Sequence, residues 1–268
     1  TITALLIVFA YSHLIRKNHK GGDGIDFVPV NRKKLSKIES CILGSLLIIC
    51  FLFFFCPFLS VFASGISSLK KLFILIAFWK AVLNSIIIGF FTGFFCVLFG
   101  FAYSIFIKLK KKQSNALLQT IPLMPMAISS VIISWCATIV FHKGNVFILV
   151  LIQTLLFWPV GYRQIQNGIN QISLEIDNAS LLLSKSPIDA IFRIYIPSCK
   201  SVLLLAFVYC FAMSIGDATI PLILSIKEFN TLALYTYKLA GAYRFSQACG
   251  CGGLLAISSI LLLRIVKK

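Results

Sequence analysis

Few residues in this 268-residue chain have the type and spacing needed to catalyse a reaction or to bind a metal. Cys249 and Cys251 form a C-x-C pair, but no second cysteine pair and no nearby histidine completes a tetrahedral metal site. The three histidines, His13, His19 and His142, are scattered and share no ligand spacing. The sequence also has no G-x-x-x-x-G-K-[S/T] loop for nucleotide phosphates. We therefore expect a protein that is not an enzyme, holds no metal or cofactor, and hydrolyses no ATP itself.

The composition indicates a membrane protein. Hydrophobic residues make up 59% of the chain and the mean hydropathy is +0.96, whereas soluble domains are about 45–50% apolar. The apolar residues also occur in long blocks rather than at the spacing of one buried helix face or strand face, which is typical of segments that cross a bilayer. The fold class predicted is therefore all-α, a polytopic bundle of membrane helices.

The blocks divide the chain into three parts. Residues 1–15 are apolar and end at two basic residues, so we interpret them as the end of a preceding transmembrane helix. Residues 16–40 form a basic linker, and residues 41–268 form a transmembrane domain whose longest polar loop is 163–198. The spanning blocks predicted in this domain are Cys41–Ala63, Trp79–Ile107, Ile121–Phe141, Val146–Tyr162, Cys199–Leu224 and Ala248–Val266.

The formal net charge of +17 fits this topology. Most of the 25 basic residues lie in the linker, in short loops on one side of the alternating blocks, and at the end of the chain. Cytoplasmic loops carry an excess of Lys and Arg, so the linker, the 163–198 loop and the C-terminus are predicted to be cytoplasmic. Basic and aromatic residues are not interleaved as in nucleic-acid-binding proteins, so no nucleic-acid partner is expected.

Asp217 is the one acidic residue within, or at the edge of, a predicted spanning block. A carboxylate inside a membrane is costly and is a candidate for function by default. With the adjacent Gly216, it is a candidate for the translocation path or outer gate, where it would attract a cationic substrate. The alternative is that Asp217 marks the hydrated outer end of the fifth helix.

The loop at 174–197 combines helical apolar spacing with charge. Ser186 and Pro187 interrupt that spacing, and proline is pre-set for the first turn of a helix, so we predict two short helices joined at 184–187. We expect Pro197 to interrupt the chain before the next span. A rigid helix pair at the membrane surface suits docking into another protein, although an amphipathic loop lying on lipid would have the same pattern.

This loop resembles the cytoplasmic loop of permeases from binding-protein-dependent ABC importers. That family pattern has Glu-Ala-Ala, a glycine after three more residues, a proline soon after, and a later Leu-Pro. The matching positions, which the resemblance implies form the ATPase-coupling loop, are Asn178, Ala179, Ser180, Ser184, Pro187, Phe192 and Pro197. Three positions depart from the pattern, because Asn178 replaces the glutamate, Ser180 the second alanine and Ser184 the glycine.

A second resemblance covers residues 214–244. The segment Ser-Ile-Gly-Asp at 214–217 and the segments at 229–232 and 235–244 are similar to the thiamine and iron(III) permease group. Those permeases carry two six-helix halves in one chain, which would make this sequence the end of one half followed by a second half. The resemblance implies an all-α importer permease in the bacterial cytoplasmic (inner) membrane.

The resemblance also implies partners. These are a dimer of ABC ATPase subunits, an extracytoplasmic substrate-binding protein and a second permease half. Thiamine is the substrate that the resemblance favours, with iron(III) as the alternative. A secondary transporter without an ATPase would usually place more charged residues inside its spans, and a membrane-embedded enzyme would need a cluster of His, Asp or Glu at one face.

Overall fold

The computed structural model describes residues 37–109, 116–172 and 187–266, and all regular secondary structure in these ranges is helical, which confirms the predicted fold class. In chain order the elements are α2 (Lys37–Ile66), α3 (Leu69–Phe73), α4 (Ile76–Leu109), α5 (Ala116–Thr120), the 3-10 helix η2 (Ile121–Ala127), α6 (Ser130–Phe141), α7 (Val146–Asn170), α9 (Pro187–Ala190), the π-helix η3 (Ile191–Tyr195), α10 (Ile196–Gly216), α11 (Thr219–Leu224), α12 (Leu232–Gly241) and α13 (Phe245–Val266). Helices are expected in a bilayer, because a helix pairs its backbone N–H and C=O groups with one another where no water is present to bond them.

Five of the described helices are long and apolar enough to cross a membrane. They are Ile42–Ile66, Ile76–Lys108, Val146–Asn170, Ile191–Gly216 and Phe245–Leu262. A sixth crossing is possible where two shorter helices meet, since Leu118–Ala127 and Ser130–Phe141 pass the same test together. The chain is therefore a multi-pass membrane protein.

The third predicted span is not one straight helix. The sequence suggested a continuous block over Ile121–Phe141, but the two helices there meet at an angle of 86°. Pro122 and Pro125 lie in η2, and neither can donate a backbone hydrogen bond to continue an α-helix. Ile128 is extended, with φ −105° and ψ 135°, and it separates η2 from α6.

The fifth predicted span begins and ends earlier in the chain than expected, at Ile191–Gly216. The sequence suggested a block over Cys199–Leu224, but α10 ends at Gly216 and the short helix α11 follows after a break. Asp217 in the break has an extended backbone, with φ −82° and ψ 118°. Its side chain bonds the backbone of the next helix, and this competition with the regular ladder explains why the span stops here.

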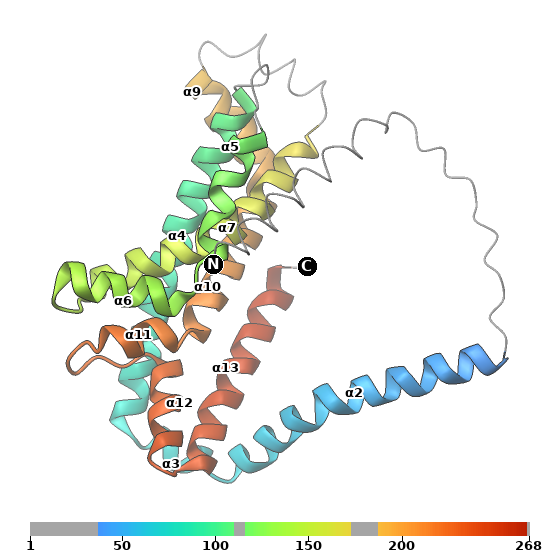
Figure 1. Ribbon diagram of the computed structural model, residues 1–268, viewed down its shortest axis with the longest axis vertical. Coiled ribbons are helices and arrows are strands. Elements are labelled where there is room, and N and C mark those ends of the chain that lie inside the picture. Colours follow the sequence, from blue (N-terminus) through green and yellow to red (C-terminus); the bar gives the residue numbers. More distant parts are fainter. Residues whose placement is uncertain (1–36, 110–115, 173–186, 267–268) are drawn as a thin grey trace.

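Three helices, α4, α7 and α10, form the centre of the bundle (Figure 1). Small residues allow their backbones to approach closely. A Cβ atom on Gly100 of α4 would lie 3.1 Å from the backbone nitrogen of Tyr162 on α7. A Cβ atom on Gly168 of α7 would lie 2.7 Å from the methyl groups of Val202 on α10. A Cβ atom would therefore force Val202 to shift at Gly168, and would require the neighbouring backbone to give by a few tenths of an ångström at Gly100.

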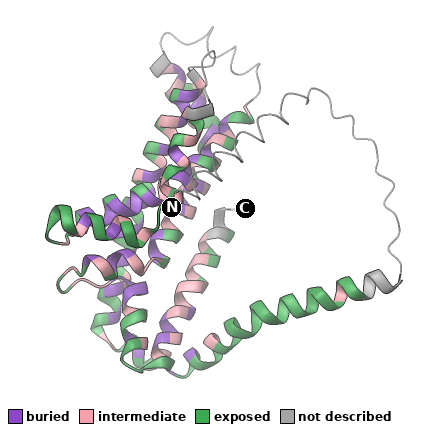
Figure 2. Ribbon diagram, viewed as in Figure 1, coloured by how far each residue is buried: buried purple, intermediate pink, exposed green. Residues whose placement is uncertain are grey.

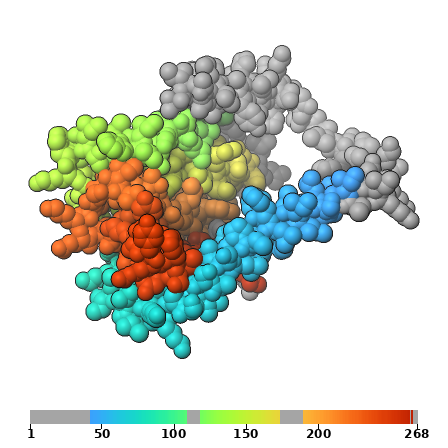
Figure 3. All heavy atoms as spheres, turned by 60° about the horizontal axis from the view of Figure 1, so that its bottom comes forward, coloured from blue at the N-terminus to red at the C-terminus, as the bar shows by residue number. Residues whose placement is uncertain are grey.

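Helix α2 extends away from this bundle, as both the ribbon and the space-filling view show (Figures 1 and 3). Its most apolar window has no buried residue, and it is coloured almost entirely as exposed in Figure 2. It contacts the rest of the chain through its last turns, where a Cβ atom on Gly65 would lie 2.8 Å from the backbone nitrogen of Gly250 in α13. A Cβ atom on Gly250 would in turn lie 3.3 Å from the backbone oxygen of Gly65, so the two helices approach each other closely at a pair of glycines.

Candidate functional site

A buried group of polar side chains joins the three central helices. Thr92 lies midway along α4, Gln153 lies in α7 and Ser214 lies near the end of α10, and all three are buried. The amide oxygen Oε1 of Gln153 accepts hydrogen bonds from Thr92 Oγ1 at 3.2 Å and from Ser214 Oγ at 2.6 Å. Buried polar groups are costly unless they are paired, so this arrangement fixes the register of the three helices.

Asp217 extends this group to the break between α10 and α11. Its Oδ2 atom faces Gln153 Nε2 at 3.4 Å, a long hydrogen bond in which the amide donates. The backbone N–H of Thr219 donates to Oδ1 at 3.1 Å, and that of Ile220 donates to Oδ2 at 3.3 Å. The carboxylate therefore caps α11 and ties it to α7. All three of these partners are hydrogen-bond donors.

This geometry bears on the two roles considered for Asp217. The residue is half-buried and bonded to α7 and α11, and it lies level with the middle of α4 rather than at the end of the bundle. Gly216 beside it is exposed, and an added Cβ atom would meet nothing within 4 Å. Packing therefore does not require glycine at this position.

The sequence analysis did not identify Thr92, Gln153 and Ser214 as a cluster. A glutamine inside an apolar block, as at Gln153, is the signal in the sequence that could have identified it.

The described part of the predicted coupling loop begins at Pro187, which lies in α9. The residues before it lie outside the described part, so the predicted start of a helix at Pro187 stays a prediction. Phe192 in η3 is 67% exposed, and Pro197 is also exposed. Asp189 and Arg193 form an ion pair at 2.6 Å on this surface. The remaining predicted loop residues, Asn178, Ala179, Ser180 and Ser184, lie outside the described residues.

Contrary to the prediction, Pro197 does not interrupt the helix. The helix continues through it, but the preceding residues widen into the π-helix η3, in which the N–H of Ile196 bonds to the carbonyl of Ile191. A proline ring clashes with the carbonyl four residues before it, here that of Arg193. Widening the turn relieves this clash, which explains why a π-helix precedes Pro197.

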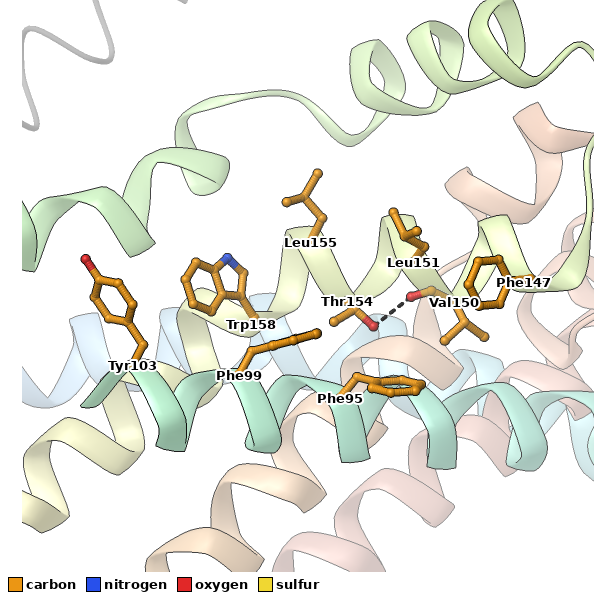
Figure 4. Close-up of a pocket in the computed structure, with 9 residues that line it drawn as sticks. All are labelled: Phe95, Phe99, Tyr103, Phe147, Val150, Leu151, Thr154, Leu155 and Trp158. Carbon is orange, nitrogen blue, oxygen red and sulfur yellow. Dashed lines mark hydrogen bonds between the residues drawn. The ribbon is translucent and has the colours of Figure 1, made fainter. Parts of the chain in front are cut away.

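An apolar slot of about 500 Å³ lies between α4 and α7 (Figure 4). Its lining residues are Phe95, Phe99, Tyr103, Phe147, Val150, Leu151, Thr154, Leu155 and Trp158. The hydroxyl of Thr154 is already bonded to the carbonyl of Val150 at 2.7 Å. The slot therefore offers aromatic and aliphatic surface, and sequence reasoning did not identify it.

Among the described residues, no three His, Cys, Asp or Glu side chains come together in a way that could hold a metal ion. Cys251 is buried, whereas Cys249 is half-buried, and neither forms a disulfide. The described part of the chain thus contains a polar cluster where α4, α7 and α10 meet, but no assembled metal centre. It also contains the C-terminal end of the predicted coupling loop, α9 and η3, which we call the loop root.

Comparison with known proteins supports the fold. No protein-family model and no curated protein matches the sequence. The structure is similar to the crystal structure of a bacterial ABC transporter involved in the import of the acidic polysaccharide alginate, with a TM-score of 0.64, 17% identity, and coverage of 84% of this chain and 93% of that one. It is also similar to a bacterial alginate ABC transporter in complex with a periplasmic protein that holds an alginate pentasaccharide, with a TM-score of 0.63, 17% identity, and coverage of 86% and 93%.

These similarities define a class of fold. The chain has the all-α, multi-pass membrane fold of a bacterial ABC importer permease.

Proposed function

We propose that this chain is the membrane-spanning permease subunit, or half, of an ATP-driven ABC importer. The observation that carries the proposal is the permease fold over 84% of the chain, combined with a loop that resembles the importer coupling loop between α7 and α10. The C-terminal part of that loop region, α9 and η3, lies at one end of the bundle (Figure 1). ATPase binding there would move the central helices.

The proposed partners follow from this role. The chain has no phosphate-binding loop, so two ATPase subunits would supply the hydrolysis. An extracytoplasmic binding protein would deliver the substrate to the opposite end, and a second permease half would complete the pathway. The exposed apolar surface of α2 requires lipid or another membrane helix around it.

We propose thiamine as the substrate, because residues 214–244 resemble the thiamine permease and Asp217 places a carboxylate at mid-depth in the bundle. Iron(III) remains the alternative within the same group. The two similar transporters import an acidic polysaccharide. Uptake of labelled thiamine, an iron(III) complex and an alginate oligosaccharide by cells with and without this chain separates the three candidates.

Cysteine cross-linking tests the importer role directly. Phe192→Cys places a thiol at an exposed position of η3. Tyr237→Cys places a control thiol at an exposed position of α12, at the other end of the bundle. The background would have the exposed native cysteines changed to serine. We expect the first variant alone to cross-link to a copurified ATPase subunit.

Labelling of the same two variants in intact cells tests their sidedness. A membrane-impermeant maleimide should reach the thiol at position 237 but not the thiol at position 192. If the thiol at 192 reacts from outside, the loop faces away from the cytoplasm and the proposed function is wrong.

A further inference from the structure

The side chain of Lys108, at the end of α4, contacts two other elements at the root of the predicted coupling loop. Its Nζ atom donates a hydrogen bond to the carbonyl oxygen of Ile169, in the last turn of α7, at 3.4 Å. The same atom lies 4.9 Å from the centre of the Tyr195 ring, in η3. One ammonium group therefore joins both sides of the loop to α4.

Both contacts have a clear electrostatic basis. The carbonyl groups at the end of a helix carry the negative end of its dipole, so a cation is favourable beside Ile169. The face of an aromatic ring also attracts a cation, more strongly where water is excluded. Tyr195 is only 4% exposed, so its ring offers such a surface.

The surroundings of Lys108 are tightly packed. A buried apolar cluster unites the ends of α4 and α7 with α9, η3 and the start of α10, and its members include Ile105, Ile165, Ile169, Ala190, Tyr195 and Cys199. The segment that carries Tyr195 is π-helical, and single π-helical turns interrupt the regular hydrogen-bond ladder of a helix. The least regular part of the loop root is thus the part that Lys108 holds.

We propose that Lys108 is a positioning residue that clamps the loop root to the ends of α4 and α7. With the clamp in place, displacement of α9 and η3 moves the central helices as one body. Without it, η3 bends at its widened turn and absorbs the displacement. The inference rests on the proposed function for its use in transport, but the clamp itself is a property of this chain.

Distance measurements between two spin labels test the clamp. One label is attached at Phe192→Cys in η3 and the other at Ala102→Cys in α4, both exposed positions, with the exposed native cysteines changed to serine. The transporter is purified from membranes with any bound ATPase and measured with and without MgATP and vanadate. The variants compared are Lys108→Met, Lys108→Arg and the control Lys80→Met, which removes an exposed lysine near the start of the same helix.

We expect a narrow distance distribution that MgATP does not change in the unsubstituted transporter, in Lys108→Arg and in Lys80→Met. Lys108→Met should broaden the distribution even without nucleotide, and shift it when MgATP is added. In unlabelled transporter that keeps Phe192, reconstituted into vesicles without vanadate, Lys108→Met should leave ATP hydrolysis in place while transport per ATP falls about fivefold.

A second variant guards against misfolding of the first. Tyr195→Leu removes the ring and should broaden the distance distribution as Lys108→Met does. The double variant should broaden the distribution no further than either single variant. A distribution that stays narrow in both single variants would overturn the clamp. If no ATPase copurifies with the unlabelled chain that keeps Phe192, the proposed function fails. The comparison of distance distributions without nucleotide still tests the clamp in that case.

Discussion

Replacement of Asp217 by asparagine is the most informative single change. The carboxylate now faces three donors, namely the backbone N–H groups of Thr219 and Ile220 and the side-chain amide of Gln153. Asparagine keeps the shape but has only one acceptor oxygen, and its amide nitrogen is itself a donor. At least one of the three donors must therefore lose its partner.

The size of the effect follows from these contacts. Asparagine caps helices about as well as aspartate, so the bonds to the start of α11 are the ones most easily kept. The bond to Gln153, already long at 3.4 Å, is then replaced by a contact between two donors. An unpaired buried donor costs about 1–3 kcal/mol. We expect Asp217→Asn to lower uptake and thermal stability while ATPase assembly is unaffected.

A compensating variant makes the reasoning specific. Gln153→Glu alone should also destabilise the protein, because it brings a second carboxylate against Asp217. In the double variant, the introduced glutamate still accepts from Thr92 and Ser214, and it can accept a bond from the introduced asparagine amide. The double-mutant cycle should therefore show a favourable coupling of about 1–2 kcal/mol.

Thermal unfolding of the four proteins in detergent, together with uptake in cells, measures this coupling. Strictly additive losses would refute the proposed contact between positions 153 and 217. Unchanged uptake by Asp217→Asn, despite normal expression, would instead show that the carboxylate is only a helix cap and has no part in the translocation path.

Three further changes test the packing. Gly168→Ala should cost about 1–3 kcal/mol by overlap with Val202, and Val202→Ala in the same chain should recover most of it, as melting temperatures would show. Gly65→Leu should separate α2 from the backbone of Gly250, and loss of a disulfide engineered between α2 and α13 would detect this. Tyr103→Phe should cost about 1 kcal/mol in unfolding measurements, because its hydroxyl bonds the backbone of α5 at 2.7 Å.

The two functional regions would act at different levels of the molecule. The loop root lies at the end of the central helices, where Lys108 and the buried apolar cluster join it to α4 and α7. The polar cluster around Gln153 lies further along the same helices, beside the break after Gly216. A movement that begins at the loop would therefore reach the break between α10 and α11 through rigid, closely packed helices.

The sequence by itself determined the class of structure and much of its layout. Hydropathy is read along the chain, and a bilayer imposes the same length on each crossing, so the apolar blocks locate the long helices without knowledge of their neighbours.

Only the tertiary structure decided which of these helices touch and where they break. Thr92, Gln153 and Ser214 come from three helices far apart in sequence, and their bonds exist only because α4, α7 and α10 pack together. The end of α10 at Asp217 is fixed by such contacts and by local capping, against an apolar pattern that runs on to Leu224. Hydropathy records affinity for lipid, whereas side-chain hydrogen bonds between helices depend on orientation and distance, which one-dimensional patterns do not contain.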